Sequence, residues 1–223
     1  MKYSAKTITR TTGGLLLAGL LAAGSAIAAD TTGNTGNALS SKGSSFVKEA
    51  AAGNQSEIAL AQLAQQKAQN PEVKSLAQMI QQDHQQAQEK LQTIAQAHGI
   101  ALEQSPSWMQ RRTQSKLEKL NGAEFDQQYA KDMLEDHVTD IKKFEKASQS
   151  IEDSDVKQYA QECLPKLQAH LQHAEAAAKS AGVDQSTISS ITKKMPNAVG
   201  GAGENNENGR GAGQSANPNV PQP

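Results

Sequence analysis

Four polar side chains interrupt stretches of the sequence that otherwise carry apolar residues at helical spacing: Glu57, His84, His137 and His170. Apolar residues recur every three or four positions around each of them, which places these side chains on the buried face of an α-helix. Imidazole and carboxylate groups together suit Zn, Fe, Mn or Cu. If the four positions meet at one level, they predict a site for one transition metal ion, whose identity the sequence leaves open.

Two aspartates and one more histidine lie beside these positions in the chain. Asp83 and Asp136 each directly precede one of the histidines, so they can reach the edge of the same layer. His173 follows one helical turn after the last histidine and shares part of its face. The predicted set of metal-site residues is therefore Glu57, Asp83, His84, Asp136, His137, His170 and His173.

A second interpretation of the same residues involves no metal. Buried polar groups can form a hydrogen-bonded network that fixes the register of packed helices. A single histidine in a core more often has this role than that of a ligand. Three histidines and several carboxylates at one level favour the metal site, and both interpretations remain open from the sequence.

The elements that position these residues are four long helices, predicted at about 45–69, 71–98, 124–148 and 155–181. Asn70 is a good N-cap with Pro71 at the first helical position, and Gly99 is suited to end the second helix. A short connector helix at about 106–120 is expected to be anchored by Trp108. Because short loops favour antiparallel neighbours, we expect an all-α, up-down-up-down four-helix bundle over 44–182.

Composition excludes several classes of protein. Only 36% of the 223 residues are hydrophobic and 3% are aromatic, which is unlike an all-β sandwich or barrel. The single cysteine, Cys163, cannot form an internal disulfide. A formal net charge of −1 gives no basic face for nucleic acid. No nucleophile elbow or phosphate-binding glycine loop is present, so we identify no catalytic residue and favour a non-enzyme.

The two ends of the chain differ from its middle. Residues 1–28 combine a basic start, a short apolar stretch and Ala26-Ile27-Ala28, which predicts a secretory signal peptide and a periplasmic or secreted protein. The mature chain is expected to have no transmembrane segment. Residues 29–43 are expected to form a disordered linker, and 183–223 a mostly disordered tail rich in Gly, Asn and Pro, with a short helical turn within 183–195.

Three runs carry a resemblance to a known family: SFVKEAAAGNQSEIALAQLAQQKAQNPEVKSLAQMIQQDH, KLNGAEFDQQYAKDMLEDH and LPKLQAHLQHAE. Over about 46–178 the chain resembles an uncharacterised family of exported bacterial proteins with a ferritin-like fold, often labelled outer membrane proteins. The matching signposts are Glu57, Asp83-His84, Glu135-Asp136-His137 and His170. The resemblance implies a ferritin-like fold and no established activity, with a place in envelope stress tolerance as a hypothesis.

The chain departs from the wider ferritin-like class at the residues that bind two irons. That class uses Glu-x-x-His motifs, whereas Gln81, Leu134 and Leu167 stand three residues before the histidines here. Fewer carboxylates supply less negative charge for two cations. We therefore expect one metal ion or none, rather than a di-iron oxidase centre.

Overall fold

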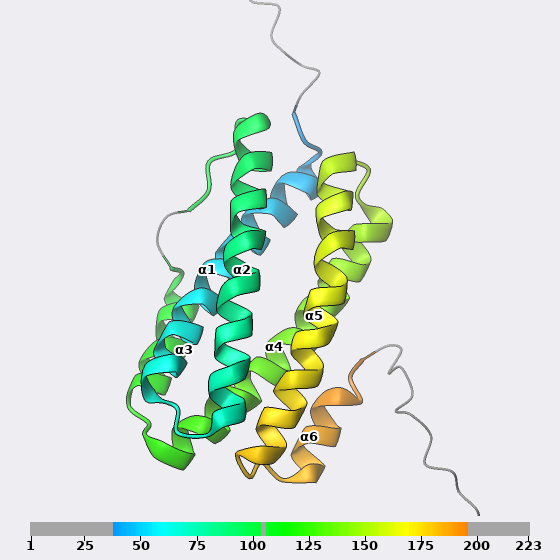
Figure 1. The fold of residues 1–223 in the computed structure, drawn as a ribbon. Helices are drawn as coiled ribbons and strands as arrows, with labels where there is room; N and C mark the ends of the chain where they lie inside the picture. Colours follow the sequence, from blue (N-terminus) through cyan, green and yellow to red (C-terminus); the bar gives the residue numbers. More distant parts are fainter. Residues whose placement is uncertain (1–37, 104–105, 196–223) are drawn as a thin grey trace, which may run out of the picture. The chain divides into compact units, whose positions relative to one another are not determined.

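The computed structural model describes residues 38–103 and 106–195. This part of the chain is all-helical, as predicted, and contains no strand (Figure 1). The predicted signal peptide, most of the predicted linker and the tail from residue 196 lie outside the described residues. The helices are α1 Ser41–Lys67, α2 Pro71–Ala97, α3 Trp108–Glu118, α4 Gly122–Ser150, α5 Ser154–Ser180 and α6 Gln185–Thr192.

The predicted break between α1 and α2 is confirmed. The Asn70 side chain accepts hydrogen bonds from the backbone N–H groups of Glu72 and Val73, and Pro71 opens the helix. Gly99 follows the C-terminus of α2 with φ +65°, a conformation that glycine adopts without strain. The signals at Asn70 and Pro71 end one helix and begin the next within a few residues, so that α1 and α2 form a helical hairpin.

Two pairs of long helices, each joined by a three-residue loop, pack together as hairpins. α1 lies along α2, and α4 lies along α5. The two hairpins meet mainly through α2 and α5, which run side by side in Figure 1. α1 and α4 make fewer direct contacts, and α3 packs against both of them. The histidine-bearing helices α2, α4 and α5 are thereby held next to one another.

The buried apolar residues form two clusters, and every long helix contributes to both. One cluster includes Leu60, Leu76, Ile80, Phe125, Tyr129, Met133 and Ala174. The other includes Phe46, Leu91, Ile141, Phe144, Tyr159 and Leu167. Most of the buried polar residues fall between the two apolar segments of their helix: Asn54, Glu57, His84, Gln88, His137 and His170. One more, Asp126, lies near the start of α4, where its carboxylate accepts from the backbone N–H groups of Gln69 and Asn70. The polar layer predicted from the interrupted stripes is therefore present in the core.

Two features differ from the sequence predictions. Trp108 does not anchor the connector helix: it is 62% exposed, because α3 lies on the outside of α1 and α4 and buries only Leu117. α1 begins at Ser41, inside the predicted linker, where the Ser40 side chain caps it by accepting from the Gly43 N–H. Beyond α5, the helix α6 lies within 183–195, where a short helical turn is expected; it is held by the buried Ile188 and packs on α4 and α5.

Candidate metal centre

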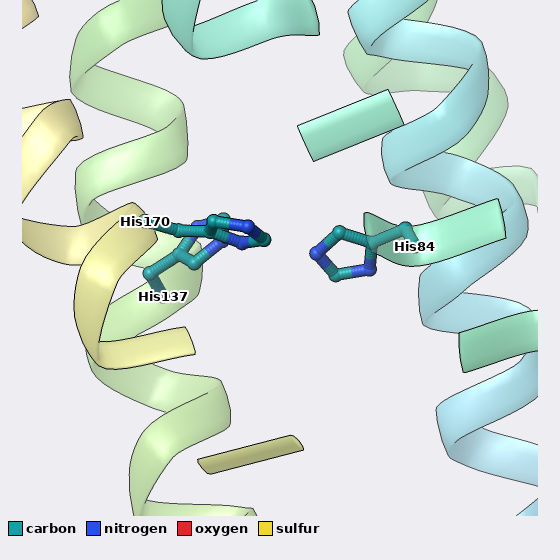
Figure 2. Close-up of side chains that lie close together, drawn as sticks. All are labelled: His84, His137 and His170. Atoms are coloured by element: carbon teal, nitrogen blue, oxygen red, sulfur yellow. The ribbon is translucent and has the colours of Figure 1, made fainter. Parts of the chain in front are cut away.

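Three histidines from three helices meet in the polar layer. His84 projects from α2 toward His137 of α4 and His170 of α5 (Figure 2). One ring nitrogen of each lies within 4.8 Å of those of the other two, and the side chains are 5%, 0% and 1% exposed, respectively. Among the described residues, this is the group of three or more potential ligands that is close enough to hold one metal ion.

The outward-facing nitrogen of each histidine has a fixed acceptor. His137 Nδ1 donates to the Met133 carbonyl oxygen at 2.9 Å, and His170 Nε2 donates to Asp83 Oδ2 at 2.9 Å. His84 Nδ1 lies 2.9 Å from Asn54 Oδ1, an acceptor whose amide nitrogen donates elsewhere. A neutral imidazole has one donor and one acceptor nitrogen. The remaining nitrogens, which face into the group, therefore carry lone pairs when the rings are neutral.

Two of these lone pairs face each other directly. His137 Nε2 and His170 Nδ1 are 3.1 Å apart. Two neutral acceptors cannot form a hydrogen bond, so the contact requires a proton or a cation between them. Imidazole nitrogens that share one metal ion at ordinary bond lengths lie roughly 3.0–3.4 Å apart. The pair is already close to the separation that joint ligation needs.

Glu57 joins the group from α1 through His84. Its Oε2 lies 2.7 Å from His84 Nε2, and the side chain is only 4% exposed. Among the described residues neither of these two buried atoms has a well-directed hydrogen bond. Burial opposes ionisation, but the charges of the three histidines outweigh it and lower the pKa of Glu57 to about 2. Glu57 is close to His84, not a fourth member of the mutually close group.

The histidines differ in how readily they take a proton. Burial would lower the pKa of His84, but the Glu57 carboxylate outweighs it and raises that pKa. Burial and the neighbouring His137 lower the pKa of His170 to about 4. Without a metal, the protein therefore holds an ion pair between Glu57 and His84 and keeps His170 neutral.

Asp83 orients His170 from outside the group. Its carboxylate accepts from His170 and from Lys166 Nζ at 2.6 Å. Burial raises the pKa of Asp83, but these two hydrogen bonds prevail and keep it below its usual value. A carboxylate on the outer nitrogen fixes the tautomer of a metal-binding histidine and increases the basicity of the inner nitrogen.

The family of the protein adds no biochemical assignment to this geometry. The sequence profile of a domain of unknown function, DUF4142, matches residues 28–177, which is more than half of the chain. The chain belongs to the DUF4142 family. No curated protein and no solved structure matches it. The predicted membership of an uncharacterised family is thus confirmed, and the DUF4142 range contains Glu57 and all three buried histidines.

Besides Glu57 and Asp83, two further predicted site residues of this DUF4142 chain lie outside the group of three histidines. Asp136 and His173 are both exposed. Asp136 lies one residue before His137, and His173 lies three residues after His170. The resulting rotation about the helix axis is enough to direct each side chain away from the core. Asp136 instead borders a surface groove between α1, α3 and α4.

Three contributors to the DUF4142 centre were not predicted. Asn54 holds the outer nitrogen of His84, the Met133 carbonyl holds that of His137, and Lys166 holds Asp83 in place. Spacing gave a usable signal for two of them: Asn54 lies three residues before Glu57, and Lys166 lies four residues before His170. A backbone carbonyl leaves no such signal.

The described helices of the DUF4142 chain include none with an apolar run long enough to cross a membrane. The four residues that meet in the polar layer, one from each long helix, are instead enclosed by the two apolar clusters. What this arrangement can do chemically is bind a cation among nitrogen donors that are screened from water.

Proposed function

We propose that the protein binds one transition metal ion through His84, His137 and His170. The observation that carries this proposal is that the outward-facing nitrogen of each of the three histidines has a fixed acceptor. The inward-facing nitrogen of each ring is therefore left as a potential metal ligand. Such outer hydrogen bonds are typical of histidines that ligate metal. A bound cation most directly relieves the contact between the two acceptor nitrogens of His137 and His170.

The donor set favours some metals over others. An inner set of three imidazoles suits Zn, Cu or Fe, whereas Mn prefers oxygen ligands. Glu57 supplies one buried negative charge beside the site, which balances half the charge of a divalent ion. A second ion would require further carboxylates that the described group lacks. We therefore propose a single divalent ion.

The setting of this site is part of the same proposal. We infer an antiparallel, ferritin-like four-helix bundle, supported by the two hairpins and by their contact through α2 and α5. Export to the periplasm rests on the pattern of residues 1–28. A place in envelope stress tolerance, including association with the outer membrane, rests on the family resemblance. N-terminal sequencing of the periplasmic protein tests export, and a chain beginning after Ala28 is the expected result.

The experiment for metal binding uses untagged protein purified from the periplasm. Elemental analysis is expected to find about one ion per chain in the wild type and far less in His84→Ala and His137→Ala. His173→Ala is the matched control, since it removes an exposed imidazole from α5 and should keep the metal. A metal-free protein whose melting temperature ignores added Zn, Cu, Fe and Mn would overturn the proposal, because a ligand of the native state must stabilise it.

A second candidate function is purely structural. Asn54 links His84, Gln88 and Tyr159 in one buried hydrogen-bonded network, which could fix the register of α1, α2 and α5 without metal. In that case the His84→Ala variant loses stability, yet neither it nor the wild type responds to metal. The stability of the metal-free proteins and their response to Zn separate the two functions.

A further inference from the structure

Two large apolar side chains lie exposed next to each other at the start of α3. Trp108 is 62% exposed and Met109 is 54% exposed, and among the described residues they are the exposed large hydrophobic side chains. One such side chain on a surface needs no explanation, but two adjacent ones form an apolar patch. Trp is also enriched where lipid meets water, because its ring is apolar and its N–H can donate a hydrogen bond. The start of α3 is therefore a candidate contact surface.

Basic side chains follow Trp108 along the outer face of α3. Residues spaced by four, three and four positions lie in one row on a helix. Here that row is Trp108, Arg112, Ser115 and Lys119, and all four are exposed. Arg111 is exposed beside the row. The outer face of α3 therefore combines an aromatic ring with cations along its whole length.

The inner face of α3 holds the helix on the protein. Leu117 is fully buried, and Gln110 Nε2 donates to the Ala52 carbonyl oxygen of α1 at 2.5 Å. At the other end of the helix, Lys67 Nζ donates to the Glu118 carbonyl oxygen. A capping box closes the first turn. The outer row is thus presented on a helix that is already formed, so that docking carries no cost of ordering it.

Positive charge exceeds negative charge around this row. The cations are Arg111, Arg112, Lys119 and, at the C-terminal end of α3, Lys67. The carboxylates are those of Glu118, within α3, and Glu103, in the segment before it. The adjoining stretch of α1, residues 52–67, adds no further exposed charge. Four cations against two carboxylates favour an anionic partner.

The side of α3 that faces α4 has a different charge balance. Lys116 lines a groove there with Asp132, Glu135 and Asp136. Lys131 lies 3.9 Å from Glu135. Because these two lysines face three carboxylates, neither of them is counted with the row. The surface that favours an anion is therefore the outer face of α3 and not this groove.

The size of this face favours a lipid surface over a protein partner. α3 has 11 residues and is therefore about 16 Å long. A stable protein interface needs roughly 800 Å² on each partner, which one row of side chains on so short a helix does not reach. A bilayer needs no such area of matched shape. A Trp ring enters it at the level of the headgroups, and Arg and Lys lay their apolar stems beside the ring with their charges at the phosphates.

We propose that the outer face of α3 docks the protein on an anionic lipid bilayer. Trp108 and Met109 enter the interface between headgroups and acyl chains, and Arg111, Arg112 and Lys119 contact lipid phosphates. The inference deepens the membrane association in the proposed function by naming the element that makes the contact. It does not depend on the metal site, since none of these residues belongs to the histidine group.

The test is co-sedimentation of untagged protein, purified from the periplasm, with lipid vesicles. Equal parts of phosphatidylglycerol and phosphatidylcholine supply an anionic surface, and phosphatidylcholine alone supplies a neutral one. The wild type should sediment with the anionic vesicles and much less with the neutral ones, and added salt should weaken binding because it screens the charges. Hydrogen exchange of the wild type should show vesicle-dependent protection concentrated in 106–120, which locates the contact without any substitution.

Two variants separate the contribution of the charges from that of the ring. Arg111→Gln/Arg112→Gln should weaken binding to anionic vesicles by about 10–30-fold, because each basic residue near an anionic surface contributes about fivefold. Lys142→Gln/Lys146→Gln removes the same two charges from exposed positions of α4 and is the matched control. Trp108→Ala should weaken binding by about tenfold, and Trp108→Phe should recover most of it, since the ring supplies the apolar contact.

The substituted side chains are all exposed, so circular dichroism should find wild-type helix content in every variant. A wild type that ignores anionic vesicles would overturn the proposal, and binding of soluble polyphosphate instead would indicate a soluble polyanion. Vesicle binding that is equal in the wild type, Arg111→Gln/Arg112→Gln and Trp108→Ala would also overturn it and would assign any membrane association to another part of the chain. Elemental analysis of the same samples separates this result from the metal site: these variants should hold as much metal as the wild type, and a metal-free protein leaves the vesicle result unchanged.

Discussion

The two helical hairpins contribute to the same buried layer in different chemical forms. α1 and α2 supply an acid and a base, Glu57 and His84, whose charges compensate each other. α4 and α5 supply two bases, His137 and His170, whose facing nitrogens are both acceptors when neutral. The charges of the first pair balance each other without any ligand, whereas the second pair leaves two facing acceptors without a proton or cation between them. Dependence on metal should therefore be concentrated in the second hairpin.

The sharpest way to break this comparison is to remove one base from the second hairpin. His170→Ala should lower metal affinity by more than about 100-fold, because even loss of a partner of a ligand costs about 10–100-fold. The free energy of unfolding of the metal-free protein should fall by much less than the free energy of metal binding, since the contact between the two acceptor nitrogens disappears with the ring. Competition with a chelator measures the affinity, and urea denaturation measures the stability. Unchanged affinity in His170→Ala would contradict the assignment of the second hairpin.

The first hairpin should respond in the opposite way to loss of its acid. Glu57→Gln should destabilise the metal-free protein by about 3 kcal/mol, because it leaves the buried His84 without its counter-charge. Its effect on metal affinity should be smaller than that of His170→Ala. Asp136→Asn removes an exposed carboxylate from α4 and serves as the control in urea denaturation. Equal stability of the two variants would show that the ion pair contributes little.

The pH dependence of the metal-free protein should divide along the same line. The folded pKa of His170 is about 4 and its ordinary value is 6.5, so the unfolded chain takes up the proton first as pH falls. Stability should therefore be lost between those two values, by at most about 3 kcal/mol. His84 has a raised pKa, so its contribution is present below 6.5 and is lost as pH rises through that raised value.

Thermal denaturation across this pH range checks both limbs. His170→Ala should flatten the acid limb between pH 6.5 and 4 and leave the alkaline limb in place. Glu57→Gln should remove the alkaline limb, because the carboxylate that raises the pKa of His84 is gone. An acid limb that persists unchanged in His170→Ala would show that another group causes it.

The smallest expected effect on metal affinity tests the support of the second hairpin from outside. Asp83→Asn keeps the shape of the side chain but weakens its hold on the outer nitrogen of His170. We expect metal affinity to fall by about 10–100-fold, without loss of the ion. Glu135→Gln, on an exposed face of α4, is the comparison, and chelator competition is again the measurement. Similar metal affinities in Asp83→Asn and Glu135→Gln would show that Asp83 does not support the ligand His170 and acts only through its contact with Lys166.

Helical periodicity was sufficient to predict the polar layer. His84, His137 and His170 each have an apolar residue three or four positions before them and another three or four positions after them, so their burial follows from the stripe alone. The same pattern and the Asn70-Pro71 signal predicted the long helices to within a few residues. Periodicity is reliable here because burial of a continuous face decides where each helix lies.

The remaining features depend on information that a stripe does not contain. Adjacent positions are rotated by about 100° on a helix, so Asp136 is exposed although it precedes a buried histidine. Trp108 was predicted to be an anchor from its residue type, but α3 offers the core only its C-terminal part. The protonated nitrogen of each histidine is fixed by partners on other turns or other helices, which only the folded chain brings together.

The exposed Trp108 has a practical consequence for spectroscopy. It is the only tryptophan in the chain, and its indole already meets water in the folded protein. Its emission reports the surface of α3 rather than the packing of the core, so fluorescence excited at tryptophan should change little when the core melts. A tryptophan placed at Phe144, beside the histidine group and next to Tyr159, would put the fluorophore in the core, where its emission should change on metal binding and on unfolding.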